Sequence, residues 1–363
     1  MSKKITKIVV TGGPCAGKTT AFSWIQNAFS ERGYTVLFVP ETATELITGG
    51  VIPSNCRSGL DFQRFLMNLQ LEKEKIFDRA AENQLSDKVL VVCDRGLPDA
   101  GAFMTDEEYR TVLCELGKTE VQARDGYDAV FHLVTAAKGA VSYYTTANNT
   151  ARTETPQQAA AVDDRLISSW TGHPHLRVID NSTDFEGKMK RLIAEILVVL
   201  GEPEPLEIER KFLIEYPDIA MLENDPNCRR VEIVQTYLKS KAEEEVRIRR
   251  RGNGGSFIYY KTVKRRVSDV KRIEIEERLS QSEYELLMNE ADPARRQICK
   301  TRYCLTYEGQ YFEIDVFPFW NDRAIAEIEL SDENDAVRFP DFLKVIKEVT
   351  DDELYKNASL AKI

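Results

Sequence analysis

The stretch Leu206-Glu207-Ile208-Glu209-Arg210-Lys211-Phe212-Leu213-Ile214 decides how the second half of this chain folds. It follows the proline-containing segment Gly201-Glu202-Pro203-Glu204-Pro205, which predicts that a new structural unit begins here. Successive side chains of a β-strand point to opposite faces, so Glu207, Glu209 and Lys211 share one face and the apolar residues share the other. Two carboxylates beside an ammonium group suit a divalent cation next to a phosphate. A single strand of this kind is also typical of a charged surface in contact with water.

The same alternation of charged and apolar residues returns in the segments 246–249, 257–264, 272–276, 300–302, 312–316 and 326–330. Gly252-Asn253-Gly254-Gly255 is a hairpin signal, and short strands in series predict an antiparallel sheet or barrel. The acids on the charged faces are Glu207, Glu209, Glu274, Glu276, Glu313, Asp315, Glu327 and Glu329. The bases are Lys211, Arg247, Arg249, Lys264, Arg272, Lys300 and Arg302, with Lys356 as a candidate eighth.

A barrel that closes around these charged faces explains the balance between acidic and basic residues better than strands whose charged faces point to solvent. The interior of an eight-stranded barrel is just wide enough for side chains or one small ligand. Its apolar outside would need a cover, for which segments 282–289 and 341–349 or the N-terminal domain are candidates. Inside, arginine and lysine would grip phosphates, and carboxylates would hold Mg²⁺ or Mn²⁺. Such a cation lowers the pKa of a bound water that can attack phosphorus.

This ordered set of strands resembles the CYTH superfamily, the triphosphate tunnel metalloenzymes, whose signature is the Glu207-x-Glu209-x-Lys211 opening. The resemblance covers nearly all of residues 206–363 and implies an eight-stranded antiparallel tunnel. Members include inorganic triphosphatases, thiamine triphosphatases, RNA 5′-triphosphatases and class IV adenylate cyclases. Among these, the lack of an obvious nucleoside-reading element in this half favours a small linear triphosphate.

The resemblance also implies a role for each matching residue. The implied metal ligands are Glu207, Glu209, Glu327 and Glu329, with Glu313 and Asp315 helping or positioning water and Glu274 and Glu276 binding a second metal or orienting bases. The implied phosphate ligands are Lys211, Arg247, Arg249, Lys264, Arg272, Lys300 and Arg302. The implied catalytic groups are Glu207, Glu209, Lys211, Glu313, Asp315 and, near the scissile phosphate, Lys356.

The first half of the chain opens with a short apolar run, 5–10, that predicts a buried parallel strand. The next residues match G-x-x-x-x-G-K-[ST] in full, and a helical segment, 20–32, follows. Backbone amides of such a loop cradle phosphates, the lysine reaches the β- and γ-phosphates, and the threonine hydroxyl ligates Mg²⁺. The predicted ATP-binding residues are Gly12, Gly13, Pro14, Cys15, Ala16, Gly17, Lys18, Thr19 and Thr20, with Thr19 on the metal.

Further strands at 35–39, 88–93, 128–135 and 176–179 alternate with helices at 61–81 and 185–200, which predicts a parallel α/β sheet. Asp94 follows a strand, where an acid could hold Mg²⁺ through water or accept a substrate proton; it could also be a turn aspartate. Arg95 and Arg152 are candidates to bind nucleotide or acceptor phosphate, or are ordinary loop arginines. These features resemble P-loop nucleoside and nucleotide kinases, especially the AAA-type family that is similar to nicotinamide riboside kinase.

The composition limits the remaining possibilities. The 363 residues predict two domains, 1–201 and 206–363, so the expected fold is an α/β P-loop domain followed by an α+β tunnel domain. A net charge of −10 argues against a nonspecific nucleic-acid or membrane binder. Seven cysteines without a CxxC pair are typical of reduced thiols in a cytoplasmic protein. We expect neither a signal peptide nor a membrane span.

The leading functional hypothesis is metal-dependent hydrolysis of tripolyphosphate, or of a nucleoside or other organic triphosphate, in the C-terminal tunnel. One alternative is a nucleoside or small-molecule kinase in which the tunnel is an accessory domain. Others are a class IV-type adenylate cyclase and a nucleotide or polyphosphate sensor without turnover. The expected ligands are a small triphosphate, ATP or another nucleotide, and Mg²⁺ or Mn²⁺. The sequence leaves the phosphoryl acceptor and the oligomeric state open.

Overall fold

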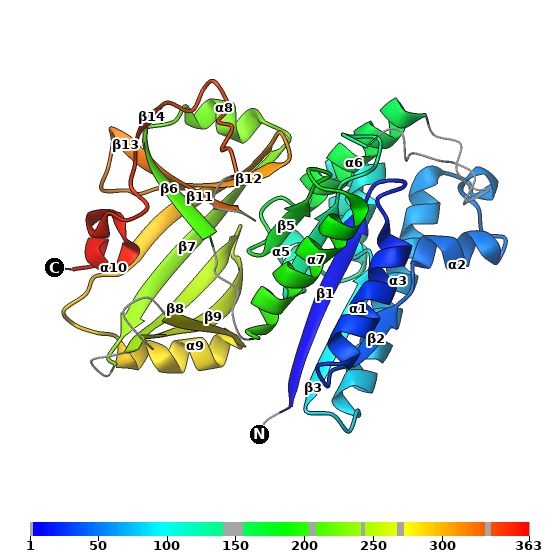
Figure 1. The fold of residues 1–363 in the computed structure, drawn as a ribbon, viewed down its shortest axis with the longest axis horizontal. Coiled ribbons are helices and arrows are strands. Elements are labelled where there is room, and N and C mark those ends of the chain that lie inside the picture. The colour runs from blue at the N-terminus through cyan, green and yellow to red at the C-terminus, as the bar shows by residue number, and fades with distance from the viewer. Residues whose placement is uncertain are drawn as a thin grey trace. The chain divides into compact units, whose positions relative to one another are not determined.

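The structure is a computed structural model that describes residues 3–140, 155–202, 208–240, 244–266, 272–330 and 335–362, without the side chains of 208, 265–266 and 272–275. The chain divides into two compact units, Met1–Pro205 and Leu206–Ile363, which are described separately below (Figure 1). No helix in the described ranges is long and apolar enough to cross a membrane.

The N-terminal unit contains a parallel five-stranded sheet, which confirms the predicted α/β class. Its strand order is β2 (Thr35–Val39), β3 (Lys88–Asp94), β1 (Lys4–Gly12), β4 (Ala129–Leu133) and β5 (Leu176–Ile179). All carboxyl ends of the strands therefore meet at one edge of the sheet, where ligands of open α/β sheets bind.

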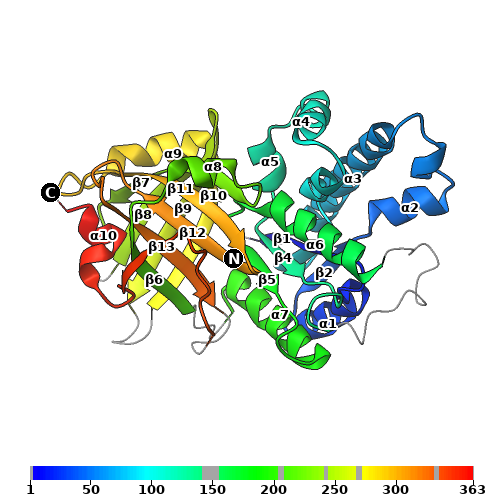
Figure 2. The same ribbon diagram turned by 90° about the horizontal axis from the view of Figure 1, so that it is seen from above.

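Helices cover both faces of this sheet, so its strands are buried on both sides. Figure 2 shows α1 (Lys18–Ser30) and α7 (Phe185–Leu200) on one face and α3 (Gly59–Glu82) and α6 (Pro156–Trp170) on the other. The first pair packs apolar side chains such as Phe29 and Leu192 against Ile8 and Phe131. Short helices complete the unit: α2 (Thr42–Thr48), η1 (Pro53–Asn55), η2 (Leu97–Phe103), α4 (Asp106–Glu115) and α5 (Glu120–Arg124).

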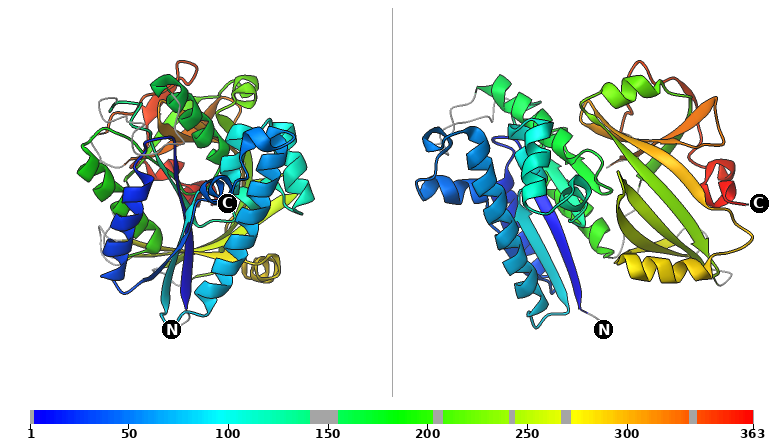
Figure 3. Two further views of the ribbon diagram at one scale, coloured as in Figure 1. Left: turned by 90° about the vertical axis from the view of Figure 1, so that its right-hand side faces the viewer. Right: turned by 180° about the vertical axis from the view of Figure 1, so that it is seen from behind.

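The C-terminal unit contains an antiparallel sheet of nine strands. Their order is β10 (Arg272–Leu279), β9 (Ser256–Arg266), β8 (Glu244–Asn253), β7 (Cys228–Leu238), β11 (Ile298–Tyr307), β12 (Gln310–Val316), β13 (Arg323–Leu330), β6 (Ile208–Glu215) and β14 (Val345–Glu348). The sheet curls strongly along this order (Figures 1 and 3). The predicted antiparallel sheet is confirmed, and so is the hairpin, since Gly254 and Gly255 both have positive φ between β8 and β9.

The described sheet has one strand more than the eight of the predicted tunnel, because segment 341–349 adds the short edge strand β14. The preceding residues of that region do cover the outer face, since Phe339, Phe342 and Leu343 pack against Phe212 and Phe312. The predicted cover at 282–289 is confirmed as α9 (Gln281–Leu287), followed by η4 (Met288–Glu290). The remaining short helices are α8 (Ile219–Asn224), η5 (Glu353–Tyr355) and α10 (Asn357–Leu360).

The inner face of the curled sheet carries charged side chains and two apolar clusters. Along β11, for example, Ile298 belongs to one cluster and Cys304 to the other, with Lys300 and Arg302 between them. The first cluster contains Tyr237, Ile298, Phe317, Ile325 and Ala361; the second contains Val231, Ile233 and Cys304. On β11, apolar side chains therefore flank the two charged residues at both ends.

Candidate functional site

Antiparallel register brings predicted acids and bases from four strands of the C-terminal unit together. Arg302 on β11 lies opposite Asp315 on β12, and Glu327 on β13 lies opposite both Glu313 on β12 and Lys211 on β6. These five residues, with Glu209, Arg249, Glu276 and Lys300, are called the charged belt below. All nine were predicted from the period-two alternation, because that period fixes which face each side chain occupies.

Arg302 is the centre of the charged belt. Its Nε donates to Asp315 Oδ1 at 2.6 Å, and its Nη2 donates to Asp315 Oδ2 at 2.6 Å and to Glu327 Oε2 at 2.8 Å. Its Nη1 pairs with Glu313, and Lys300 pairs with Asp315. Arg302 is 7% exposed and Asp315 is 1% exposed, so water screens these charges weakly. Burial, followed by the charge of Arg302, lowers the pKa of Lys300.

Lys211, from the stretch that opens the unit, joins two carboxylates. Its Nζ lies 2.6 Å from Glu327 Oε1 and 3.0 Å from Glu209 Oε2. Burial opposes ionisation of both Lys211 and Glu327, but their opposite charges prevail: the pKa of Lys211 is raised, and that of Glu327 is lowered by Lys211 and Arg302. Both groups are therefore charged at neutral pH.

A second part of the belt lies on β8, β9 and β10. Arg249 Nη2 donates to both carboxylate oxygens of Glu276, at 3.1 and 2.9 Å, and the Thr262 hydroxyl donates to Glu276 at 3.1 Å. Arg249 also lies over the ring of Tyr260. The alternation placed Thr262 and Arg251 on this face but gave them no role, and the sequence analysis missed Gln235, which is buried on the same face. Gln235 could have been found from the alternation at 231–237 on β7, a strand that was not predicted.

Other predicted tunnel residues have different surroundings. Arg247 and Lys264 are half-buried on the inner face, whereas Glu329 is exposed near the end of β13. Lys356 precedes α10, is 31% exposed at its side chain and pairs with Glu353. Glu207 lies outside the described residues, as do the side chains of Arg272 and Glu274, whose backbone forms part of β10.

The carboxylates of the belt fit a divalent cation by their chemistry. In the parts of the chain that the structure describes, no three His, Cys, Asp or Glu side chains form a ready metal site, since the belt acids contact lysine and arginine. Yet Glu313 lies opposite Glu327, and Glu209 opposite Glu329. Like charges so placed repel one another, and a cation between them removes that cost. The oxygen donors suit Mg²⁺ or Mn²⁺.

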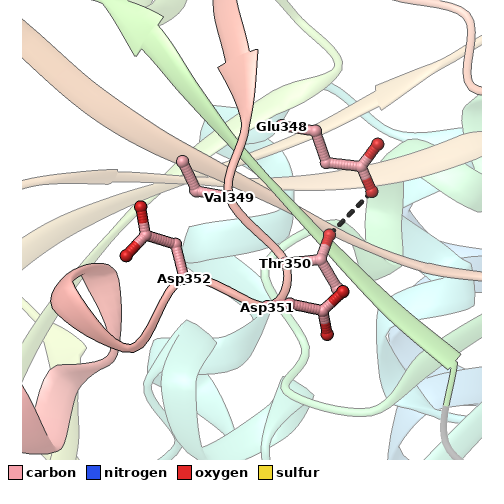
Figure 4. Close-up of a pocket in the computed structure, with 5 residues that line it drawn as sticks. All are labelled: Glu348, Val349, Thr350, Asp351 and Asp352. Atoms are coloured by element: carbon pink, nitrogen blue, oxygen red, sulfur yellow. Dashed lines mark hydrogen bonds between the residues drawn. The ribbon is translucent and has the colours of Figure 1, made fainter.

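A separate surface hollow of about 370 Å³ lies beside the end of β14. It is lined by Glu348, Val349, Thr350, Asp351 and Asp352 (Figure 4). Thr350 Oγ1 donates to Glu348 at 2.7 Å and accepts the backbone N–H of Lys211 at 3.1 Å. The lining includes none of the predicted site residues, so the hollow does not coincide with the charged belt.

The glycine-rich loop of the N-terminal unit has the conformation that its sequence predicts. It connects β1 to α1, and Gly17 has φ +91° at the N-terminus of α1. A Cβ on Gly12 would lie 2.2 Å from the backbone oxygen of Leu133, so only glycine fits at that close approach. Lys18 begins α1, and Thr19 and Thr20 are exposed in its first turn. The helix N-terminus therefore presents Thr19 and Thr20 to solvent, where an anion could bind.

Two strands, β2 and β3, bring charged side chains to the edge beside this loop. Lys18 Nζ lies 4.0 Å from Asp94 Oδ1, and Arg95 Nε donates to Glu41 at 2.8 Å. Burial raises the pKa of Asp94 to about 6, while Lys18 acts in the opposite direction. Burial would also raise the pKa of Glu41, but the charges of Lys18 and Arg95 lower that pKa to about 2. Asp94 and Glu41 thus differ in proton affinity within one cluster.

The sequence analysis missed Glu41, Asp99 and Asp163 in this unit. Glu41 follows β2 after one residue, Pro40, so the rule that ligands bind at the carboxyl ends of strands could have identified it. Asp99 accepts from the Gly96 N–H at 2.8 Å and from Trp170 Nε1 at 3.2 Å, contacts that no local pattern reveals. Arg152, a predicted nucleotide-binding residue, lies outside the described residues.

Comparison with known proteins finds a matching family for each unit. Residues 7–188 match the AAA domain family, and residues 205–351 match the CYTH domain family. The inorganic triphosphatase of Acetivibrio thermocellus is 32% identical over 163 residues, covering 43% of this chain and 93% of that relative. The inorganic triphosphatase of Nitrosomonas europaea is 32% identical over 159 residues, covering 43% and 96%.

Two solved structures are also similar to parts of this chain. The crystal structure of an inorganic triphosphatase is 30% identical and covers 44% of this chain and 95% of that chain, with a TM-score of 0.31. Thymidylate kinase from Ehrlichia chaffeensis is 16% identical and covers 54% of this chain and 98% of that chain, with a TM-score of 0.36. With the family matches and the relatives above, the chain belongs to the AAA domain family in its N-terminal half and to the CYTH domain family in its C-terminal half.

Proposed function

We propose that the C-terminal unit hydrolyses a small linear triphosphate, with tripolyphosphate as the first candidate, and that it depends on a divalent cation. The observation that supports this proposal is the charged belt, in which Lys211, Lys300 and Arg302 lie among carboxylates on an inward face. Inorganic triphosphatases are among the relatives of this unit. A nucleoside triphosphate and another organic triphosphate are the remaining substrates to compare.

The basic and the acidic residues of the charged belt would have different roles. Lys300 and Arg302 would donate to the anionic phosphate oxygens, exchanging their carboxylate partners for phosphate as substrate enters. Glu209, Glu313, Asp315, Glu327 and Glu329 would hold the cation, which supplies charge neutralisation and an acidified water when bound. Lys211, between Glu209 and Glu327, would orient both carboxylates and stabilise charge on the terminal phosphate. Water adds to phosphorus as the anhydride bond breaks, giving orthophosphate and pyrophosphate.

The apolar residues that flank Lys300 and Arg302 on β11 favour a short substrate. On β11 only Lys300 and Arg302 lie on the inner face between Ile298 and Cys304. Residues two apart in a strand are separated by roughly 7 Å, which is the scale of a triphosphate and much shorter than a long polyphosphate.

Glu209→Ala is expected to lower tripolyphosphate hydrolysis about 10–100-fold at limiting Mg²⁺ or Mn²⁺, the scale of a weakened metal site. Part of the loss should recover at high metal concentration, because the other carboxylates remain. Phosphate release at graded metal concentrations measures both effects. Glu232→Ala is the matched control, since Glu232 lies in the same sheet but pairs at the surface with Arg230. Equal activity of wild type and Glu209→Ala at every metal concentration would contradict the proposal.

A second function, nucleotide binding by the N-terminal unit, is favoured by the P-loop and by the charged cluster beside it. We propose ATP as the ligand, with Lys18 on the phosphates, Thr19 on Mg²⁺, and Asp94 and Arg95 facing a phosphoryl acceptor. This unit would act as a nucleoside or small-molecule kinase, or as a nucleotide sensor if no acceptor exists. Cyclic AMP and pyrophosphate as products from ATP would instead identify a cyclase.

Lys18→Met is expected to weaken MgADP binding roughly 10–100-fold, because a hydrogen bond to a charged group is worth about 1.5–3 kcal/mol. Titration calorimetry with MgADP measures the affinity. Lys75→Met is the matched control, since Lys75 is exposed on α3 and pairs only locally, with Glu72, among the contacts described for it. Unchanged MgADP affinity in Lys18→Met, or no binding by the wild type, would remove the P-loop from the proposed function.

A further inference from the structure

A buried carboxylate on α6 holds the start of the P-loop. The backbone N–H of Gly13 donates to Asp163 Oδ1 at 2.9 Å, and Asp163 is 0% exposed. A Cβ added to Gly13 would lie 2.8 Å from this oxygen, so the absence of a side chain at Gly13 is what permits the contact. The sequence separation of the two residues is large, and no motif in the chain predicts their pairing.

The same carboxylate is fixed from three other directions. Asp163 Oδ1 also accepts the Thr135 N–H at 3.1 Å and lies 2.9 Å from His132 Nε2, while Oδ2 lies 3.0 Å from Lys138 Nζ. Because an ionised carboxylate can only accept, the Nε2 atom of His132 carries the proton in this contact. Burial alone would raise the pKa of Asp163, but His132 and Lys138 hold that pKa below its usual range. The carboxylate is therefore an ionised, immobile acceptor.

A lysine on α7 holds the same loop from another helix. Lys188 Nζ donates to the backbone oxygens of Ala16 at 3.3 Å and Val134 at 2.6 Å, and to Asn181 Oδ1 at 2.7 Å. Lys188 is 3% exposed, so its position is set by packing as well as by these bonds. Asp163 thus binds an N–H of the loop, and Lys188 binds a carbonyl of the loop.

These contacts fall on the first half of the loop, Gly13 to Ala16. The second half, Gly17 to Thr19, leads into the N-terminus of α1, where backbone amides and Lys18 would face a bound anion. A carbonyl that pointed inward would repel phosphate, and the bond from Lys188 turns the Ala16 carbonyl toward α7 instead. Binding is stronger when such a site is ordered before the ligand arrives, because less ordering entropy is lost on association.

We propose that Asp163 and Lys188 form a clamp, defined by these two side chains, which holds the P-loop in its anion-binding conformation in the absence of nucleotide. Both are positioning residues that act through the loop backbone and touch no phosphate. The clamp rests on the proposed role of the P-loop in nucleotide binding. It makes nucleotide affinity depend on how α6 and α7 are seated against the loop.

The test compares Asp163→Asn and Lys188→Met with two neighbours on the same helices. Asp164→Asn and Lys190→Met are the matched controls: Asp164 pairs with Lys138, Lys190 pairs with Glu186, and both are well exposed. Hydrogen exchange of the full-length protein without nucleotide measures the order of residues 12–19, and calorimetry measures MgADP affinity. Each clamp variant should speed exchange in this peptide at least about 10-fold and weaken MgADP binding about 10-fold. The controls should match the wild type in both measurements.

The two measurements separate the clamp from the function on which it rests. Faster loop exchange in the clamp variants with no MgADP binding by the wild type would retain the clamp and refute nucleotide binding. Wild-type exchange and wild-type affinity in both clamp variants would overturn the clamp while leaving nucleotide binding intact. If Asp163→Asn fails to fold, Lys188→Met decides alone, because it approaches the loop from the other helix. Exchange that rises equally over the whole unit would show a merely structural role and would also overturn the proposal.

Discussion

Replacing Arg302 by methionine is expected to lower kcat/KM for tripolyphosphate about 10³-fold, the upper scale for losing one preorganised charge-stabilising donor. Arg302 reaches Glu313, Asp315 and Glu327 from one guanidinium group, so it links three carboxylates of the charged belt. Its planar fork can exchange these carboxylates for phosphate oxygens without moving the strand that carries it. Phosphate release under substrate-limited conditions measures the effect.

Arg302→Lys separates the charge of this residue from its geometry. Lysine keeps the positive charge but cannot donate from a rigid fork, so we expect a loss of about 10²-fold, between the wild type and Arg302→Met. Arg230→Met is the matched control, because Arg230 lies on β7 with its partner Glu232 at the surface. Hydrolysis by Arg302→Met within a few-fold of the wild type would mean that the belt arginine does not contact the reacting phosphates.

The sequence predicted the faces of the strands better than it predicted their partners. Alternation fixes which side of a strand a residue occupies, and this identified Lys211, Arg302 and Glu327 together. It carries no information on which strands are neighbours, so the contact of Glu327 with Lys211 across β13 and β6 appears only in the structure. A pairing of residues far apart in sequence depends on strand order, which period two cannot specify.

In the N-terminal unit, too, a local pattern was predictable from the sequence and contacts between distant residues were not. The phosphate-binding loop was recognisable because its function requires glycines and a lysine at fixed spacing. Asp163 was not recognisable, because one aspartate within a helix has no local signature of a contact with Gly13. The strand β14 was missed for another reason: its four residues are all exposed, so they carry no alternation of burial to detect. A functional site could therefore be predicted where a recognisable sequence motif forms it, whereas contacts between distant parts of the chain could not.

Replacing Glu327 by glutamine is expected to destabilise the C-terminal unit by about 3–5 kcal/mol, the cost of removing one partner from a buried ion pair. Glu327 is 7% exposed and accepts from both Lys211 and Arg302. Glutamine keeps nearly the same volume, so the loss reflects charge and hydrogen bonding rather than a cavity. The two bases would remain buried with one fewer anion to balance them. Hydrogen exchange of peptides from β11, β12 and β13 measures this unit separately from the rest of the chain.

The double variant Lys211→Met with Glu327→Gln tests whether the cost arises from the unbalanced charge. Removing both partners takes away the buried ammonium together with the carboxylate, so part of the stability should return. The coupling free energy of this cycle should be at least about 1 kcal/mol, since contacting residues of one network couple by 0.5–3 kcal/mol. Additive losses would mean that Glu327 is stabilised mainly by Arg302. A loss below about 0.5 kcal/mol in Glu327→Gln, the range of ordinary surface changes, would instead mean that the belt is hydrated and that its charges are screened by water.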